Sequence, residues 1–199
     1  MMRPMVFDVS PAAPSNLAAT QTRLTATTAR VNLAWVNNAL TAPLATNFLV
    51  QRATNTAFTA GVVSYSVATP ATTLANSPVS AGTYYYRVRA ENAIAYSPWS
   101  NVVKVVVAAP TVTITRSATS IRLRSTVTLS GRAAPYVPGA LVGLYRAMPG
   151  STVYTLLSNR PLSAAGNWTY TTRPTVRGVY HYYASYAGVR TASIAVTVR

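Results

Sequence analysis

Residues 83–103 read TYYYRVRAENAIAYSPWSNVV, and the first half of this stretch alternates with a period of two. One face of the expected strand carries Tyr84, Tyr86, Val88 and Ala90. The opposite face carries Tyr85, Arg87 and Arg89. Because side chains alternate between the two faces of a β-strand, the pattern predicts a strand with one buried and one outward face. A polar turn follows, and a second strand over residues 102–107 completes a hairpin.

Further short strands are expected on both sides of this hairpin. In the first half of the chain they cover residues 31–35, 48–52 and 62–67, and in the second half residues 127–131, 141–146, 166–170, 179–186 and 194–198. Short strands separated by polar and proline turns are typical of β-sandwiches. The sequence therefore predicts an all-β fold of two tandem β-sandwiches, with Trp35 and Trp168 in their cores.

The domain boundaries follow from length and proline. The chain has 199 residues, which is enough for two small domains. The stretch PAAP at residues 11–14 is expected to be a stiff linker, because proline fixes its own φ and restricts the residue before it. We expect an N-terminal strand-like tail and linker over residues 1–14, a first domain over 15–107, a second linker over 108–110 and a second domain over 111–199.

Composition excludes several classes of protein. Hydrophobic residues make up 50% of the chain, which argues against a disordered polypeptide. No apolar run reaches 18 residues, so no transmembrane helix is expected. The start of the chain lacks a charged-then-apolar leader, so no signal peptide is expected. Cysteine is absent, which excludes cysteine metal sites and thiol catalysis but leaves an extracellular location open.

Residues 15–107 resemble a fibronectin type III domain. The resemblance rests on the Pro-Ser-Asn-Leu entry at residues 14–17, on the core Trp35, and on the tyrosine-rich strand with its Asn92 and Ser97 turn. Such domains are scaffolds, so the resemblance implies a non-catalytic spacer or binding module and does not fix the ligand. No Arg-Gly-Asp tripeptide occurs, so there is no integrin-type signal.

Residues 111–199 resemble the bacterial immunoglobulin-like domains of surface and secreted proteins. The resemblance is carried by VTLSGR at 127–132, PGALVGLYR at 138–146, AAGNWTY at 164–170 and GVYHYYASYAG at 178–188. It implies an immunoglobulin-like sandwich without the disulfide of antibody domains. It also implies a location outside the cell or at the cell surface, with a virion as the alternative.

The charge balance is strongly basic. There are 17 basic residues and 2 acidic ones, Asp8 and Glu91, and ten arginines but no acid from Arg116 onward. The summed field of such a chain attracts nucleic acid, anionic polysaccharide or lipid head groups. The arginines occur singly, as Arg122 and Arg124 do, and no nucleic-acid motif is present. We therefore expect weak polyanion binding and no specific nucleic-acid partner. Two alternative explanations of the basic charge are a background bias, with arginines spread singly along solvent-facing strands, and a longer chain whose other parts carry the acidic residues.

Catalytic chemistry is not expected from these residues. Acyl or glycosyl transfer needs a nucleophile beside a base, or two facing carboxylates, and this chain has one histidine, no cysteine and two acids. His181 lies between Tyr180 and Tyr182, so it is expected on the solvent-facing side of its strand. We predict that the chain is not an enzyme and holds no cofactor.

Outward-facing aromatic residues are the main ligand-binding candidates. Tyr85, Tyr96 and Trp99 could form a stacking platform for sugar rings, helped by Arg87 and Arg89. In the second domain, Tyr183 with His181 could do the same. The alternative is that these side chains pack across strands or into the seam between the domains, because cross-strand aromatic pairs are ordinary stabilisers of sheets.

The first residues, MMRPMVF, resemble the segment that closes the last cupredoxin domain of bacterial multicopper oxidases. In that family an HCHxxxHxxxxM motif supplies the copper ligands and a final strand follows it. The resemblance places Met1 at the axial position of type 1 copper, where a weak, long methionine bond is normal. The HCH core is missing, so copper is expected only in a longer parent chain. The alternative is an extension of a virion or surface protein that begins at its own methionine.

Three functions remain open at this stage. The first is an accessory, spacer or binding module of a secreted or surface protein, including the C-terminal part of a multicopper oxidase. The second is a structural or adhesive protein of a virion, an extracellular filament or a cell surface. The third is a carbohydrate or polyanion binder. The expected partner is a protein or polysaccharide surface.

Overall fold

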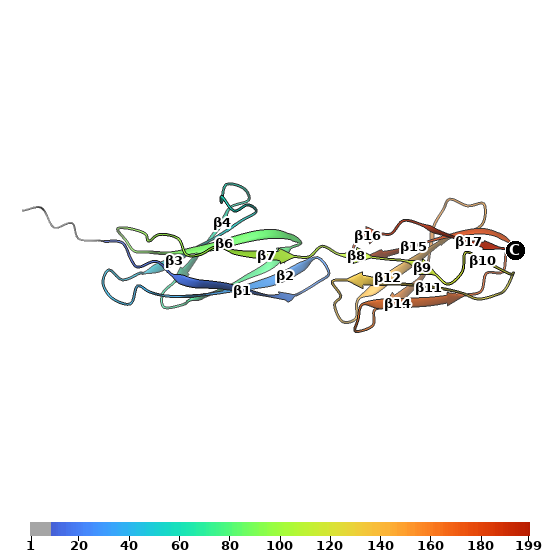
Figure 1. Ribbon diagram of the computed structural model, residues 1–199, viewed down its shortest axis with the longest axis horizontal. Coiled ribbons are helices and arrows are strands. Elements are labelled where there is room, and N and C mark those ends of the chain that lie inside the picture. Colours follow the sequence, from blue (N-terminus) through green and yellow to red (C-terminus); the bar gives the residue numbers. More distant parts are fainter. Residues whose placement is uncertain (1–8) are drawn as a thin grey trace, which may run out of the picture. The chain divides into compact units, whose positions relative to one another are not determined.

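The computed structural model describes residues 9–199, and every regular element in that range is a β-strand (Figure 1). The described chain forms two compact units, of which the first comprises residues 9–24 and Thr28–Val107 and the second comprises Ala108–Arg199 together with Thr25–Thr27. The expectation of an all-β protein made of sandwiches is confirmed. Met1, the candidate axial copper position, lies outside the described residues, as does most of the expected N-terminal tail.

The first unit is built from seven strands in two sheets. They are β1 (Ser15–Arg23), β2 (Thr28–Val36), β3 (Asn47–Ala53), β4 (Val63–Ala68), β5 (Thr73–Ser80), β6 (Gly82–Glu91) and β7 (Val103–Val107). One sheet has the order β1-β2-β5 and the other the order β4-β3-β6-β7. All of these strand pairs are antiparallel, which allows each sheet to bury one face and expose the other.

Alternation along β6 decides which of its side chains enter the core. Tyr86, Val88 and Ala90 are fully buried, while Tyr84 is half-buried and packs against the edge of the same core. Trp35 enters the core from β2 and meets the Phe48 ring edge-on at 5.4 Å. Trp35 is only 5% exposed, so its expected core position is confirmed.

The stretch at residues 11–14, which the sequence predicts to be a stiff linker, contacts the first unit. Pro11 and Pro14 are both buried. The side chain of Asn38 donates hydrogen bonds to the Ala13 carbonyl at 2.8 Å and to the Ser15 hydroxyl at 3.0 Å. The two proline rings are thus shielded from solvent, and the stretch belongs to the first compact unit.

The second unit contains ten strands, several of them very short. They are β8 (Thr111–Val112), β9 (Thr115–Arg116), β10 (Ser120–Ile121), β11 (Val127–Ala134), β12 (Leu141–Ala147), β13 (Thr155–Pro161), β14 (Asn167–Thr172), β15 (Gly178–Tyr186), β16 (Val189–Arg190) and β17 (Ile194–Val198). One sheet has the order β10-β17-β15-β12-β13, with β16 beside β15. The other has the order β14-β11-β8, with β9 beside β11.

The core of the second unit is rich in tyrosine and valine. Tyr180, Tyr182 and Tyr186 point inward from β15, and Trp168, only 3% exposed, points inward from β14. The core position expected for Trp168 is therefore confirmed. His181 lies on the opposite face of β15, as expected, but is half-buried there.

Gly131 on β11 lies opposite Trp168 in the β11–β14 pair. A Cβ atom at this position would clash with the backbone carbonyl of Thr113 and would lie 2.9 Å from Trp168 Nε1. Glycine is thus required here by close backbone approach, because Thr113 lies alongside β11 and its carbonyl occupies the space that a Cβ atom would need. No helix in the described part of the chain is long and apolar enough to cross a membrane.

Candidate functional site

The candidate ligand-binding residues of the first unit meet on the outward face of β6. Ser97 and Ser100 attach the following segment to this strand. The Ala90 N–H donates to Ser97 Oγ at 2.9 Å, and the Val88 N–H donates to Ser100 Oγ at 3.1 Å. Return bonds run from the N–H groups of Ser97 and Ser100 to the carbonyls of Ala90 and Val88, both at 2.8 Å. These bonds hold residues 96–100 alongside β6.

Within this segment, Tyr96 and Trp99 interleave with the arginines of β6. The Arg87 guanidinium carbon lies 4.0 Å from the Trp99 ring centroid, and that of Arg89 lies 4.8 Å from the same ring and 4.1 Å from the Tyr96 ring. Phe58 adds a further ring, also 4.0 Å from Arg87. We call Phe58, Arg87, Trp99, Arg89 and Tyr96 the aromatic–arginine ladder. Each contact is a cation–π interaction, since the ring centroids lie within about 6 Å of the cations.

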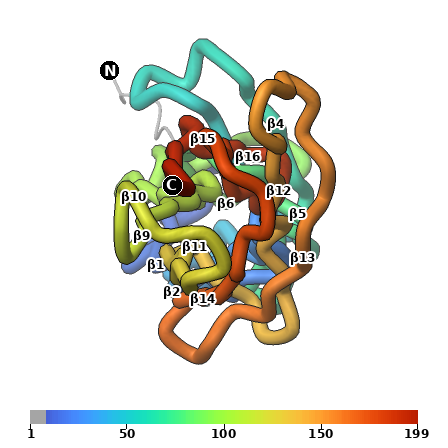
Figure 2. The backbone as a smooth tube through the Cα atoms, turned by 90° about the vertical axis from the view of Figure 1, so that its right-hand side faces the viewer, coloured from blue at the N-terminus to red at the C-terminus, as the bar shows by residue number. Residues whose placement is uncertain are grey.

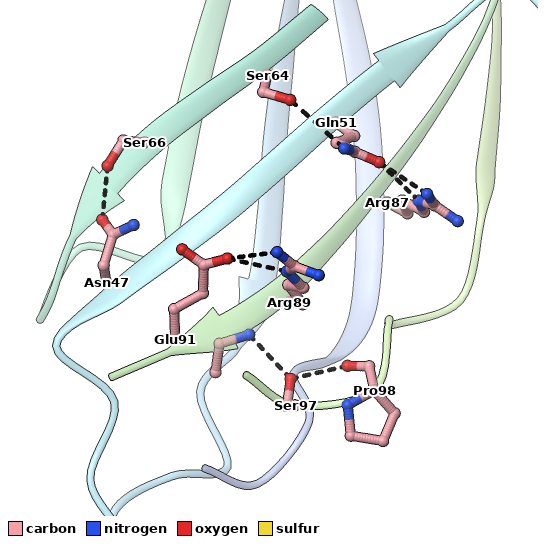
Figure 3. Close-up of polar contacts among 10 residues, drawn as sticks. Asn47, Gln51, Ser64, Ser66, Arg87, Arg89, Glu91, Ser97 and Pro98 are labelled. Carbon is pink, nitrogen blue, oxygen red and sulfur yellow. Dashed lines mark hydrogen bonds and ion pairs between the residues drawn. The ribbon is translucent and has the colours of Figure 1, made fainter. Parts of the chain in front are cut away.

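Both arginines of the ladder also have polar partners (Figure 3). Arg87 donates from Nε at 3.1 Å and from Nη2 at 2.7 Å to Gln51 Oε1 on the neighbouring strand β3. Gln51 in turn donates to Ser64 on β4 at 3.4 Å. Arg89 forms an ion pair with Glu91 at 2.8 Å. The guanidinium groups are thus held by polar partners as well as by aromatic rings.

Burial and the nearby positive charge of Arg89 both lower the pKa of Arg87 from its usual value. Glu91 is the one carboxylate side chain in residues 9–199, and it neutralises Arg89 rather than Arg87. Arg87 therefore relies on the electron-rich faces of Trp99 and Phe58 and on the Gln51 amide oxygen. These contacts indicate that the Arg87 guanidinium has a structural role, in which it links the Trp99 and Phe58 rings to the sheet.

The ladder changes what these aromatic residues can offer to a sugar. Two guanidinium groups contact the half-buried Trp99 ring, so a sugar would have to compete with them for its faces. Tyr96 is 62% exposed, which leaves part of its ring accessible. Tyr85 lies apart from the ladder, between Ala53 on β3 and Lys104 on β7. Four of the five expected residues are thus brought together.

Phe58 was not expected in this cluster. It lies in the loop between β3 and β4, is 8% exposed and has a positive φ of 55°. Phe58 lies nearly thirty residues before Arg87 in the sequence, so no local pattern predicts their contact. Phe58 is the one aromatic residue in the loop at residues 54–62, and the β3–β4 hairpin brings it to Arg87 of β6.

A second aromatic cluster covers the outward face of the second unit. Tyr183 stacks on Tyr145 of the adjacent strand at 4.7 Å, and Tyr154 meets Tyr183 edge-on at 4.9 Å. The Arg190 guanidinium lies 3.8 Å from the Tyr183 ring. His181 faces Ala147 and Ala195 across the sheet. Tyr183 is therefore grouped with two tyrosines and an arginine instead of with His181.

An open cavity of about 620 Å³ lies in the second unit. Its walls come from β13, the β13–β14 connection, β14 and β11, and include Arg160, Leu162, Asn167 and Trp168. Trp168 Nε1 is buried without a hydrogen-bond partner. A 2.9 Å hydrogen bond from Arg160 Nε to the Thr169 carbonyl restricts the Arg160 side chain.

Among residues 9–199, no three His, Cys, Asp or Glu side chains group in a way that could hold a metal ion.

Comparison with solved structures finds similarity in fold, whereas comparison of the sequence does not. No protein-family model matches the chain, and no curated protein matches it significantly. Among solved structures, the chain is similar to the FN1–FN3 domains of chicken CNTN1. The two share 12% sequence identity with a TM-score of 0.41, and the match covers 95% of this chain and 67% of the other. The fold assignment accordingly rests on the strands and sheets described above.

Proposed function

We propose that this chain is a non-catalytic spacer and binding module of a secreted or cell-surface protein, and that it binds anionic polymers through its positive charge. The observation that carries the proposal is the charge balance. The chain has a formal net charge of +15, and the single carboxylate side chain in residues 9–199 is already paired with Arg89. The surface therefore presents almost uncompensated positive charge.

The two sandwiches support the spacer part of this proposal. Each unit has its own hydrophobic core, of which Trp35 and Trp168 are central members. A unit with its own core can keep its shape without help from its neighbour. Rigid sandwiches of this kind can display charged side chains at a distance from whatever they are attached to.

Retention of the purified chain on immobilised heparin tests the binding part. Binding by counterion release loses affinity steeply with salt. We expect retention at about 50 mM salt and a loss of most affinity by about 200 mM, as for other polyelectrolyte contacts. Passage through the column without delay at low salt contradicts the proposal. A neutral polysaccharide column is the control, on which the chain is expected to show no retention.

Carbohydrate binding at the ladder is a second candidate, favoured by the 62% exposure of Tyr96. A sugar that stacks on this ring is expected to quench or shift the fluorescence of the neighbouring Trp99. A screen of neutral glycans read by tryptophan fluorescence tests it, with Tyr96→Ala as the variant that removes the exposed ring. If no glycan changes the signal, or if the change survives in Tyr96→Ala, the ladder is not a sugar site.

A separate proposal, which rests on the resemblance of residues 1–7, concerns the protein to which this chain belongs. If an in-frame HCH motif lies upstream of Met1 in the genome, it supports the proposal that this chain is the C-terminal part of a multicopper oxidase. A ribosome-binding site at that place supports a free-standing structural or adhesive protein of a virion, a filament or a cell surface.

A further inference from the structure

Exposed arginines gather at one end of the second unit, where β10 and β17 finish. They are Arg122, Arg124, Arg173, Arg177 and Arg199, and all five are exposed. In Figures 1 and 2 the C-terminus lies beside β10 at this end. In the sequence these residues occur singly over a span of 78 positions, so the fold is what collects them. We call this group the arginine end.

Backbone hydrogen bonds fix the segments that carry these arginines. The Leu123 N–H donates to the Arg199 carbonyl at 2.8 Å, and the Arg199 N–H donates to the Ile121 carbonyl at 3.0 Å. The Arg124 N–H donates to the Pro174 carbonyl at 3.0 Å. Three separate parts of the chain are thereby held together, so the main-chain positions from which these arginines project are fixed.

The pairing of β15 with β17 brings Arg177 to the same end of the unit. Gly178 pairs with Val198 at the last step of this antiparallel ladder. Arg177 and Arg199 are therefore the next residues beyond the pair, on neighbouring strand ends. Like charges at such positions repel one another, and the repulsion is relieved when an anion binds between them.

Four of these five side chains have no partner among the described residues. The side chains of Arg122, Arg177 and Arg199 make no hydrogen bond, ion pair or ring contact with residues 9–199, and neither does the Arg124 side chain, whereas Arg173 donates from Nε to the Arg124 carbonyl at 3.2 Å. Four other arginines of the second unit contact a carbonyl or an aromatic ring, namely Arg132, Arg146, Arg160 and Arg190, and the remaining one, Arg116, is half-buried with its Nε shielded from solvent. The guanidinium groups left available for a ligand are thus concentrated at the arginine end.

The chemistry of this end selects one class of partner. Several adjacent guanidinium groups match a polymer that carries repeated sulfates or carboxylates, since Arg binds such groups bidentately. Residues 121–125 and 173–178 contain no aromatic residue on which a nucleic-acid base could stack. The unit also offers no helix that could enter a groove. A flexible polysaccharide can follow a small curved surface, which a stiff DNA duplex cannot do cheaply.

From these observations we infer that the arginine end of the second unit is the principal docking site for an anionic polysaccharide. The inference rests on the proposed function, and it adds a location and a polymer class to it. Binding through the field of the whole chain would depend only on net charge. Binding at the arginine end depends on which charges are removed.

Two matched variants separate these cases. The test variant is Arg122→Gln with Arg177→Gln, and the control is Arg30→Gln with Lys104→Gln. All four side chains are exposed and make no hydrogen bond, ion pair or ring contact within the described residues, so both variants lose two positive charges without breaking a contact. Heparin affinity is measured by titration at several salt concentrations. Thermal unfolding verifies that both variants are folded.

We expect the test variant to bind heparin about tenfold more weakly at low salt, with a salt slope reduced by about two, one for each lost contact. The control variant is expected to change affinity by less than about threefold. Equal losses in the two variants overturn the location while leaving the proposed function intact. Failure of the unmodified chain to bind heparin overturns both. Duplex DNA that competes as well as heparin at equal charge overturns the choice of polysaccharide.

Discussion

The guanidinium carbon of Arg87 lies 4.0 Å from the ring centroid of Trp99, in the segment that follows the same hairpin strand. This contact adds to the Ser97 and Ser100 hydrogen bonds and to the Arg89 contacts that hold residues 96–100 on the outward face of β6. Arg87 reaches Phe58 at the same distance on the β3–β4 loop. One side chain therefore ties two loops to the sheet.

Replacing Arg87 with Lys tests this role. Lysine keeps the charge but lacks the planar fork that stacks on rings and bonds Gln51 twice. We expect Arg87→Lys to lower the free energy of unfolding of the first unit by about 1 kcal/mol, within the range of cation–π contacts. Urea denaturation followed by tryptophan fluorescence gives the value. Arg30→Lys, at an exposed position without such contacts, is expected to change it by less than about 0.5 kcal/mol. Equal effects of the two changes contradict the role of the ladder.

The two core tryptophans are expected to be essential in their own units. Removing a buried aromatic ring costs about 3–5 kcal/mol, which is a large part of the stability of a small domain. We expect Trp35→Ala to unfold or strongly destabilise the first unit and Trp168→Ala the second. Calorimetry of each variant shows which transition moves. A melting profile equal to that of the unmodified chain contradicts the core position of that tryptophan.

Two buried tyrosines with different partners provide a matched pair. Tyr86 and Tyr182 are both fully buried, one in each unit. Asn76 donates a hydrogen bond to the Tyr86 hydroxyl at 3.2 Å, whereas the Tyr182 hydroxyl has no partner. We expect Tyr86→Phe to cost about 1–2 kcal/mol because it leaves the Asn76 amide unpaired, and Tyr182→Phe to be neutral or stabilising. Chemical denaturation of both variants checks the order, and a larger loss in Tyr182→Phe is the opposing result.

The same tyrosines predict instability at high pH. Burial raises the pKa of Tyr86 to about 12 against the opposing hydrogen bond from Asn76, and burial likewise raises the pKa of Tyr182 to about 12. Unfolding returns each pKa to about 10. The folded state therefore binds more protons between these values, and its stability is complete below pH about 10 and falls as pH rises toward about 12.

Denaturation curves from pH about 8 to about 12 measure this loss, which is on the order of 2 kcal/mol for each tyrosine. The second unit of Tyr182→Phe is expected to lose less stability over this interval than the unmodified second unit. An unchanged pH dependence in that variant indicates that other groups cause the loss.

Gly131 is expected to tolerate no side chain. Its Cβ would meet the Thr113 backbone, and the Thr113 N–H bond to the Arg132 carbonyl at 2.9 Å would be disturbed. Overpacking of this kind costs about 1–3 kcal/mol or more. We expect Gly131→Ala to destabilise the second unit more than Gly150→Ala, whose φ of 77° is strained for alanine but whose Cβ would meet nothing within 4 Å. Thermal unfolding of the two variants ranks them, and the reverse order contradicts the close approach of Thr113.

Much of the fold was predictable because β-strands have a short and regular period. The alternation of Tyr84 to Ala90 indicated one buried and one outward face, and the outward arginines followed from the same count. Strand ends were less certain. The strand expected at 62–67 covers Val63–Ala68, and the one expected at 102–107 begins at Val103. Ends depend on where a partner strand stops, which a single segment does not encode.

The candidate site was predictable only in part for a related reason. Arg87, Arg89, Tyr96 and Trp99 lie close in sequence, and a turn between them makes their meeting a local matter. Phe58 joins them from another hairpin, so its contact with Arg87 depends on the path of the β3–β4 loop. The buried prolines at positions 11 and 14 are a similar case, since local stiffness says nothing about what the rings cover.

The sequence by itself determined the all-β class, the central tryptophans of the two cores and the excess of positive charge. These properties follow from residue type and from a period of two, both of which act within a few residues. The tertiary structure alone decided that Arg87 lies between Phe58 and Trp99 and that Arg122, Arg177 and Arg199 meet at one end. Strand order and long-range backbone pairing bring such residues together, and periodicity fixes the face on which a side chain lies but not its neighbours from distant segments.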